Sequence, residues 1–176
     1  MNTRIKLLAL AGILMGFGIR ANAQLAASAS TTVDLVLPIA ITKTSEMHFG
    51  TVAASNTAGT IVLDYNSTTA VGTGGATIIS TGAAQPSSAE FKVTGQVGVT
   101  FSIGLPTEDL ILTGITDGMK AGSFKASTDG TNDVTTGTIA QGGTTLSVKG
   151  TLTVPANAVA GTYANANQLI IKVNYN

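Results

Sequence analysis

Apolar and polar residues alternate along most of the chain. Phe91 and Val93 are separated by Lys92, and the same two-residue period runs through 61–65, 97–105 and 146–154. Successive side chains of a β-strand point to opposite faces, so this pattern predicts strands with one face on a core and the other in water. No stretch of useful length has the spacing of an amphipathic helix. The pattern predicts about nine or ten strands.

The segments between these runs have the composition of turns. They are rich in Gly, Ser, Asn and Asp, and they cover 66–75, 82–88, 127–133 and 140–143. Antiparallel strands joined by such turns pack as two facing sheets. The sequence therefore predicts an all-β fold, an immunoglobulin-like antiparallel β-sandwich (Greek key), over residues 38–176.

The last ten residues, NQLIIKVNYN, alternate throughout. One face carries Leu169, Ile171, Val173 and Tyr175, and the other carries Ile170, Lys172, Asn174 and Asn176. A strand of this kind needs a core against its apolar face and a hydrogen-bonding neighbour along each edge. We expect the four apolar residues to line a groove beside this final strand. The strand that fills the groove need not belong to the same chain.

A second alternating run lies near the start of the chain. Residues 24–32 are small and polar, and the odd positions from Val33 through Leu35 and Leu37 to residue 41 are then all apolar. Three interpretations of this run are open. Residues 24–37 form an extension that donates a strand, with Val33, Leu35 and Leu37 inserted, or they begin the domain's own first strand. In the third, Pro38, which lacks a backbone donor, divides a donor segment from an own strand.

The first 23 residues have the layout of a secretory signal peptide. Basic residues at positions 4 and 6 precede an uncharged run at 7–19, and Ala21-Asn22-Ala23 matches an A-x-A cleavage site. The apolar run is short for a membrane helix, which needs about 20 residues. We expect cleavage after residue 23, export of residues 24–176, and no transmembrane segment in the mature chain.

Composition limits the possible partners. The chain has no cysteine, so no disulfide stabilises it. Residues 24–176 contain no arginine, and six lysines against nine acidic residues leave a net charge of about −3. Without a basic surface to neutralise phosphates, nucleic acid is not an expected partner.

The chain offers little material for catalysis or metal binding. His48 is the only histidine, no G-x-S-x-G motif occurs, and a zinc site is not expected from one histidine without cysteine. Asp129, Thr131 and Asp133 alternate as calcium ligands do, but a polar turn explains them better because the rest of a calcium loop is absent. Glu108 and Asp109 are adjacent and would face opposite ways. We therefore expect no enzyme activity, no metal and no cofactor.

Two stretches resemble a known family. PIAITKTSEMHFGTV (38–52) has a proline-initiated strand leading to a Phe-Gly-Thr turn, and LTVPANAVAGTYANANQLIIKVNY (152–175) runs from Val-Pro-Ala through Ala-Gly-Thr-Tyr into a final strand. Together they resemble the opening and the close of DUF4402, a family of bacterial surface domains. The part between them, 66–145, matches in pattern alone.

The resemblance implies a structural role. The family is similar to spore-coat-U-like proteins and archaic chaperone–usher pilins, in which an extension of the next subunit completes an immunoglobulin-like sandwich. Tyr175 resembles their penultimate tyrosine, whereas the cysteine pair of many spore-coat-U-like proteins is missing here. The implied protein is a non-enzymatic fibre subunit of a Gram-negative bacterium. It would bind copies of itself, and a chaperone and usher in transit from the periplasm to the cell surface. The alternative is a monomeric surface or periplasmic ligand-binding module.

Overall fold

The computed structural model describes residues 26–65, 70–79, 84–115, 118–165 and 169–176, and in these residues it has twelve strands and no helix. The predicted signal peptide (1–23) lies outside the described residues. The strands are β1 (Ala40–Ser45), β2 (His48–Phe49), β3 (Thr51–Leu63), β4 (Ala70–Ile79), β5 (Pro86–Ser87), β6 (Ala89–Thr94), β7 (Thr100–Gly104), β8 (Leu110–Leu112), β9 (Met119–Ser127), β10 (Thr136–Thr138), β11 (Thr144–Val154) and β12 (Lys172–Tyr175). The described part contains no helix that is long and apolar enough to cross a membrane. A compact domain extends from Leu35 to Asn176.

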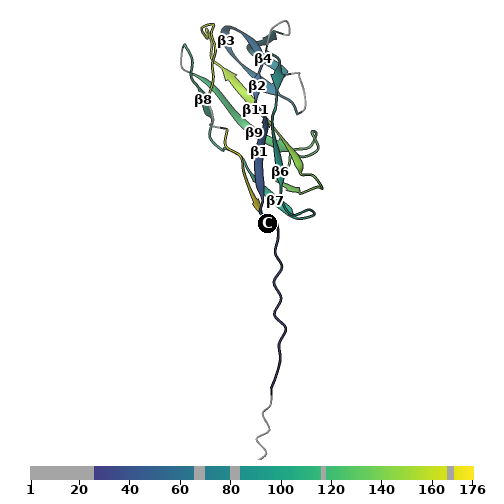
Figure 1. The fold of residues 1–176 in the computed structure, drawn as a ribbon. Helices are drawn as coiled ribbons and strands as arrows, with labels where there is room; N and C mark the ends of the chain where they lie inside the picture. Colours follow the sequence, from purple (N-terminus) through teal and green to yellow (C-terminus); the bar gives the residue numbers. More distant parts are fainter. Residues whose placement is uncertain (1–25, 66–69, 80–83, 116–117, 166–168) are drawn as a thin grey trace, which may run out of the picture. The chain divides into compact units, whose positions relative to one another are not determined.

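The larger sheet has seven antiparallel strands and is centred on β11 (Figure 1). Along one edge, β11 pairs with β6 through residues 144–148 and with β3 through 151–154. Along its other edge it pairs with β9. β1 extends the sheet beyond β6, β4 beyond β3, and β8 beyond β9. One long strand thus holds two groups of strands in a single sheet.

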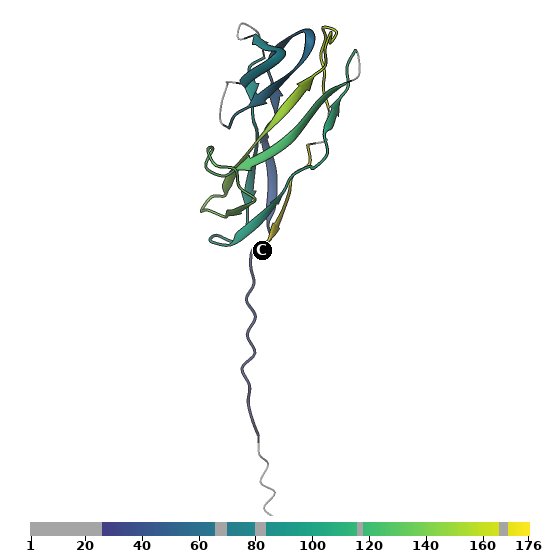
Figure 2. The same cartoon turned by 180° about the vertical axis from the view of Figure 1, so that it is seen from behind.

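The smaller sheet has the order β10-β7-β12, and β2 and β5 form a separate two-stranded pair. The main core lies between the large and the small sheet, and it contains residues of β6, β7, β9 and β11 together with Ile139 and Ile171. Figure 2 shows the same arrangement from behind. The predicted all-β sandwich is confirmed.

The strand order is that of an immunoglobulin-like sandwich. Such a domain places its strands A, B, E and D side by side in one sheet and C, F and G in the other. Here β1, β6, β11 and β9 lie in the order A-B-E-D, and β7 and β12 lie in the order C-F. In the sequence, the segment between β1 and β6, the A and B strands, contains the additional strands β2, β3, β4 and β5. No described residue occupies the position of the seventh strand, G, beside β12.

The prediction of a turn at 66–75 is wrong for residues 70–75, which begin β4. This segment pairs with β3 along Leu63↔Ala70 to Gly59↔Gly74, and the hydroxyls of Thr60 and Thr73 are 2.7 Å apart. Its glycines allow close approach of the backbone, because a Cβ on Gly72 would lie 2.5 Å from the carbonyl oxygen of Ala76. Glycine here marks an irregular strand pair and not a loop.

The predicted strand at 97–105 begins later than expected. β7 starts at Thr100, and the Val97 side chain is 54% exposed. Gly98 has a φ of +83°, and its N–H donates to the carbonyl of Ile139 at 2.8 Å. Because Gly98 has this left-handed conformation, residues 95–98 form a turn, and the Val97 side chain does not lie on the buried face of β7.

Candidate functional site

The final segment buries the face that its alternation predicts, although its strand is limited to Lys172–Tyr175 and residues 169–171 are not in a strand. Ile171 is 8% exposed, and Leu169, Val173 and Tyr175 are half-buried and pack against the main core. Ile170, Lys172, Asn174 and Asn176 are all exposed. The candidate groove residues therefore share one face, but only one of the four is fully covered by the described residues of its own chain.

Among the described residues, the backbone of β12 has a partner on one side only. β12 pairs with β7, and the N–H of Asn176 donates to the carbonyl of Thr100 at 3.3 Å. Hydrogen-bonded and non-hydrogen-bonded pairs alternate in an antiparallel ladder, so residues 172 and 174 also face β7. The N–H and C=O groups of Val173 and Tyr175 then point toward the free edge. These same residues carry the half-buried apolar side chains.

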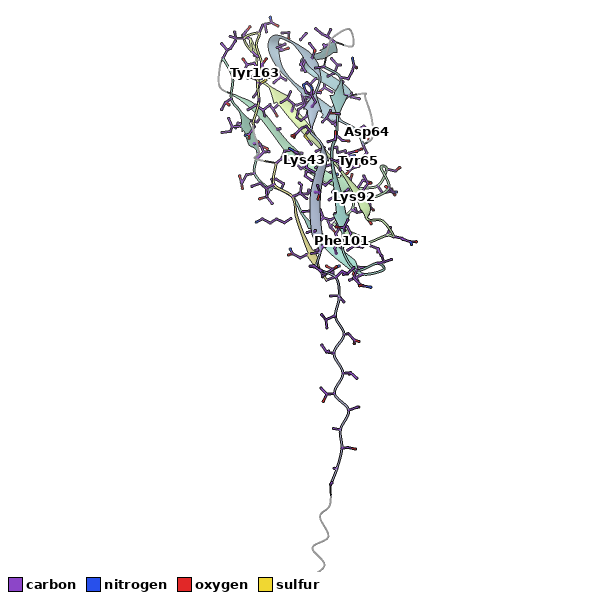
Figure 3. The ribbon with its side chains drawn as sticks, in the orientation of Figure 1. Lys43, Asp64, Tyr65, Lys92, Phe101 and Tyr163 are labelled. Carbon is purple, nitrogen blue, oxygen red and sulfur yellow. The ribbon has the colours of Figure 1, made fainter. Side chains whose placement is uncertain are left out.

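The first strand of the large sheet packs against the same core as β12. In the part of the chain that the structure describes, β1 pairs only with β6. Ile39 and Ile41 are half-buried and pack against the same core as Val173 and Tyr175. Figures 1 and 2 show β1 and β12 reaching the same end of the domain, where Phe101, labelled in Figure 3, is fully buried. A row of incompletely covered apolar side chains thus lies along the two strands.

The Tyr175 hydroxyl joins three segments of the domain. It donates to the carbonyl of Leu37 at 2.5 Å and accepts the N–H of Gln96 at 2.7 Å. The space around it is tight, because a Cβ on Gly95 would lie 2.3 Å from the hydroxyl oxygen. The bond fixes the end of β12 against the residue that precedes Pro38.

The predicted donor residues lie in a segment without strand structure. Residues 26–39 contain no strand, and β1 takes up only the last two positions of the alternating run at 33–41. The side chains of Val33, Leu35 and Leu37 are 79%, 87% and 61% exposed. Large apolar side chains at alternate positions are therefore left in water within the described residues, which is a feature of interaction surfaces.

Apart from the β12 edge, a cluster of polar side chains surrounds Asp133 on the large sheet. Asp133 accepts a hydrogen bond from Tyr65 at 2.9 Å and forms ion pairs with Lys125 at 2.5 Å and Lys149 at 3.3 Å. The Lys149 ammonium also lies 4.1 Å from the centre of the Tyr65 ring. A shallow apolar hollow of about 230 Å³, bounded by Leu105 and other residues, lies beside the cluster.

This cluster is arranged for stability. The hydrogen bond from Lys125, followed by that from Tyr65, lowers the pKa of Asp133 to about 2. Burial, and then the hydrogen bond to Asp133, raises the pKa of Tyr65 well above its ordinary value. The carboxylate is therefore held charged as an acceptor and the phenol is held protonated as a donor. Neither group is suited to act as a general base near neutral pH.

Acid should weaken the domain through Asp133. Its pKa is lower in the folded chain than the ordinary value of 3.8, so its contribution is present above about pH 4 and is lost as the pH falls toward about 2. We expect the urea midpoint to fall over this range and to fall less in Asp133→Asn. Asp34→Asn makes the same charge change in the segment before the domain and serves as the control. Equal pH dependence in wild type and Asp133→Asn would contradict this role.

The other polar candidates have structural roles. His48 Nδ1 accepts the N–H of Gly50 at 2.8 Å, which supports a turn where Gly50 has a φ of +81°. The Asp129 carboxylate accepts the N–H groups of Thr131 and Asn132 at 2.8 and 2.9 Å and lies in the predicted polar turn. Among the described residues no group of three His, Cys, Asp or Glu side chains could hold a metal ion.

Sequence reasoning found the apolar face of β12 but missed its surroundings. Ile39 and Ile41 were recognised as apolar, yet nothing local places them against the same core as Val173. The contact between Gln96 and Tyr175 joins residues 79 positions apart. Tyr175 was singled out by its resemblance to a penultimate tyrosine, whereas its hydrogen bonds follow from the packing of three segments.

Of the comparisons with known proteins, the comparison with protein families found a match. Neither a curated protein nor a solved structure matches the chain. Residues 39–175 match the family described as Domain of unknown function (DUF4402). This range contains all twelve strands and the four apolar residues of the final segment. The chain belongs to the DUF4402 family.

Proposed function

We propose that this protein is a non-enzymatic structural subunit that joins copies of itself by β-strand addition. The observation that carries the proposal is the strand order. The described residues supply A-B-E-D and C-F of an immunoglobulin-like sandwich, and the G position beside β12 is not filled by any of them. A strand from a second copy would take that position and complete the small sheet.

The chemistry of the β12 edge suits a strand as the ligand. An edge strand presents unpaired N–H and C=O groups, to which an incoming strand can bond. Val173 and Tyr175 offer both these groups and half-covered apolar side chains. The incoming strand would gain main-chain hydrogen bonds and would also cover part of the core.

The extension suits the role of the incoming strand. Residues 24–37 carry Val33, Leu35 and Leu37 at alternate positions, so one face of an extended chain would be apolar. A strand of eight residues spans about 26 Å, which is enough to run past the four residues of β12. Insertion would remove from water the large side chains that are exposed in the described structure.

Other strand edges support the proposal less. Among the described residues, β1, β4, β8 and β10 also have one partner each. β1, β4 and β8 lie at margins of the large sheet, which already contains the four strands A, B, E and D, and β10 lies beside the C strand, on the side of the small sheet away from the G position. β12 differs because its free edge coincides with an expected strand position and with a row of half-buried apolar residues.

The proposal includes a route to the cell surface. Residues 1–23 would direct export, and a periplasmic chaperone and usher of a Gram-negative bacterium would protect and assemble the subunit. This part rests on the signal-peptide pattern of the sequence and on the resemblance to chaperone–usher pilins. The assembled fibre would lie outside the cell.

Deletion of residues 24–36 tests the central proposal and keeps Leu37 in place. The protein of residues 24–176 should assemble into oligomers or filaments, seen by sedimentation and electron microscopy, and the deleted protein should remain a folded monomer. A synthetic peptide of residues 24–37 should bind that monomer and raise its melting temperature. A peptide of the same composition with its odd and even positions exchanged is the control.

The opposite result would favour the monomeric ligand-binding module. In that case the intact protein would stay monomeric at all concentrations. Deletion would then unfold the domain or leave it unchanged, and the peptide would have no effect on its melting temperature.

A further inference from the structure

Tyr175 links the proposed acceptor edge to the proposed donor segment within one chain. Its hydroxyl donates to the carbonyl of Leu37 at 2.5 Å, and Leu37 is followed directly by Pro38. The extension that would donate the strand and the β12 edge that would accept one are therefore linked through the carbonyl of Leu37. This inference rests on the proposed function and concerns how that function selects a second copy.

Leu37 and Pro38 lie where the extension could reverse direction. Proline favours the second position of a β-turn, so residues 37–40 have a suitable sequence for one. In such a turn the carbonyl of Leu37 accepts the N–H of Ala40. A turn at this point would direct residues 26–36 back along their own domain, toward the free edge of β12.

The Tyr175 hydroxyl binds the acceptor of that turn and holds this carbonyl toward the end of β12. It takes the carbonyl of Leu37, and it is itself held by the N–H of Gln96 at 2.7 Å. Its position has little freedom, since a Cβ on Gly95 would lie 2.3 Å from the hydroxyl oxygen and 2.9 Å from Ile139. The residue before a proline also prefers an extended conformation. Together these contacts favour an extended chain at Leu37.

We propose that Tyr175 is a positioning residue whose bond to Leu37 prevents the extension from filling its own β12 edge, so that Val33 and Leu35 insert into a second copy. Leu37 then belongs to the pivot of the extension. From Leu35 to Leu37 the chain spans only about 7 Å, so the neighbouring domains lie close together. The bond thus sets both the partner and the short spacing.

Cross-linking can separate insertion into the same chain from insertion into another. The chain has no cysteine, so Asp34→Cys and Asn174→Cys introduce the only two thiols. Asp34 lies on the polar phase of the extension, and Asn174 is exposed on the outer face of β12. A flexible bismaleimide should join these thiols between chains, giving a ladder of covalent oligomers on a denaturing gel.

The Tyr175→Phe substitution removes the hydroxyl and keeps the ring. Loss of one hydrogen bond should increase the ratio of internally cross-linked monomer to ladder by about fivefold. Gly95→Ala should act in the same direction because the new Cβ displaces the hydroxyl. It leaves Tyr175 unchanged and so supplies the test if Tyr175→Phe does not fold. Tyr163→Phe is the control, since that hydroxyl donates to the carbonyl of Val159 at 2.7 Å.

Each outcome bears on a different statement. An unchanged ladder in folded Tyr175→Phe and Gly95→Ala would overturn the role of Tyr175 and leave strand addition intact. Internal cross-links with Tyr175 present would also overturn it. If the protein with Tyr175 gives no cross-link within or between chains, strand addition at β12 fails, and the role of Tyr175 fails with it.

Discussion

Aspartate at positions 33 and 35 is expected to abolish assembly of the 24–176 protein and to leave the melting temperature of the monomer unchanged. Val33 and Leu35 are 79% and 87% exposed, so the isolated domain loses no packing when they are replaced. In a neighbouring copy each would bury an apolar side chain, worth about 1.5–3 kcal/mol. Burial of two carboxylates would add a further cost. Association should weaken by at least about 100-fold.

Sedimentation velocity over a range of concentrations measures this loss. The matched control is Ser30→Asp with Thr32→Asp, which adds the same charge on the opposite phase of the extension. If the control weakens assembly equally, repulsion between charged chains explains the effect and the apolar phase does not. Normal assembly of the Val33→Asp, Leu35→Asp protein would contradict the donor role of these residues.

Phe101→Ala is expected to give the largest loss of stability, about 3–5 kcal/mol in the free energy of unfolding. Phe101 is 0% exposed and lies opposite Tyr175 in the pair of β7 with β12. Its ring is closely packed, because a Cβ on Gly137 would lie 2.5 Å from it. Removing the ring leaves a cavity next to the proposed acceptor edge, so the variant should also bind the peptide of residues 24–37 less tightly.

Val97→Ala is the matched control, and it also tests whether the strand begins at Thr100, as in the structure, or at Val97, as the alternation predicts. The alternation of 97–105 predicts that Val97 and Phe101 share a buried face, whereas the structure leaves Val97 54% exposed. Its replacement should change the free energy of unfolding by less than about 0.5 kcal/mol. Urea titrations at concentrations where the protein is monomeric measure both values. A loss above about 1.5 kcal/mol in Val97→Ala would favour the original boundary.

The alternation of apolar and polar residues correctly predicted which side chains are buried wherever a strand has one face on the core. Phe91 and Val93 are buried while Lys92 is exposed, and the final segment buries Ile171 between two exposed neighbours. In these segments each side chain's environment follows from its position alone, since neighbouring residues point to opposite faces. The all-β class and the apolar face of β12 were therefore predictable.

Glycine-rich segments were harder to interpret from sequence. Gly72 and Gly74 suggested a turn, but they lie in β4, where Gly74 approaches the backbone of Ala58 in β3 and Gly72 approaches that of Ala76 in its own strand. Gly98 does lie in a turn, and the alternation of its neighbours concealed it. Glycine serves both purposes, because the absence of a Cβ permits a left-handed φ and also a close backbone contact. Which purpose applies depends on the partner strand.

The sequence by itself determined that this chain forms amphipathic β-strands, that its last strand has an apolar face, and that a second alternating run precedes Pro38. Only the tertiary structure decided that no described strand pairs with the second edge of β12 and that Tyr175 bonds to Leu37, 138 residues away. The physical reason is range. The face of a strand follows from the two-residue period of its own backbone, whereas strand order and side-chain partners depend on contacts between segments that are distant in sequence.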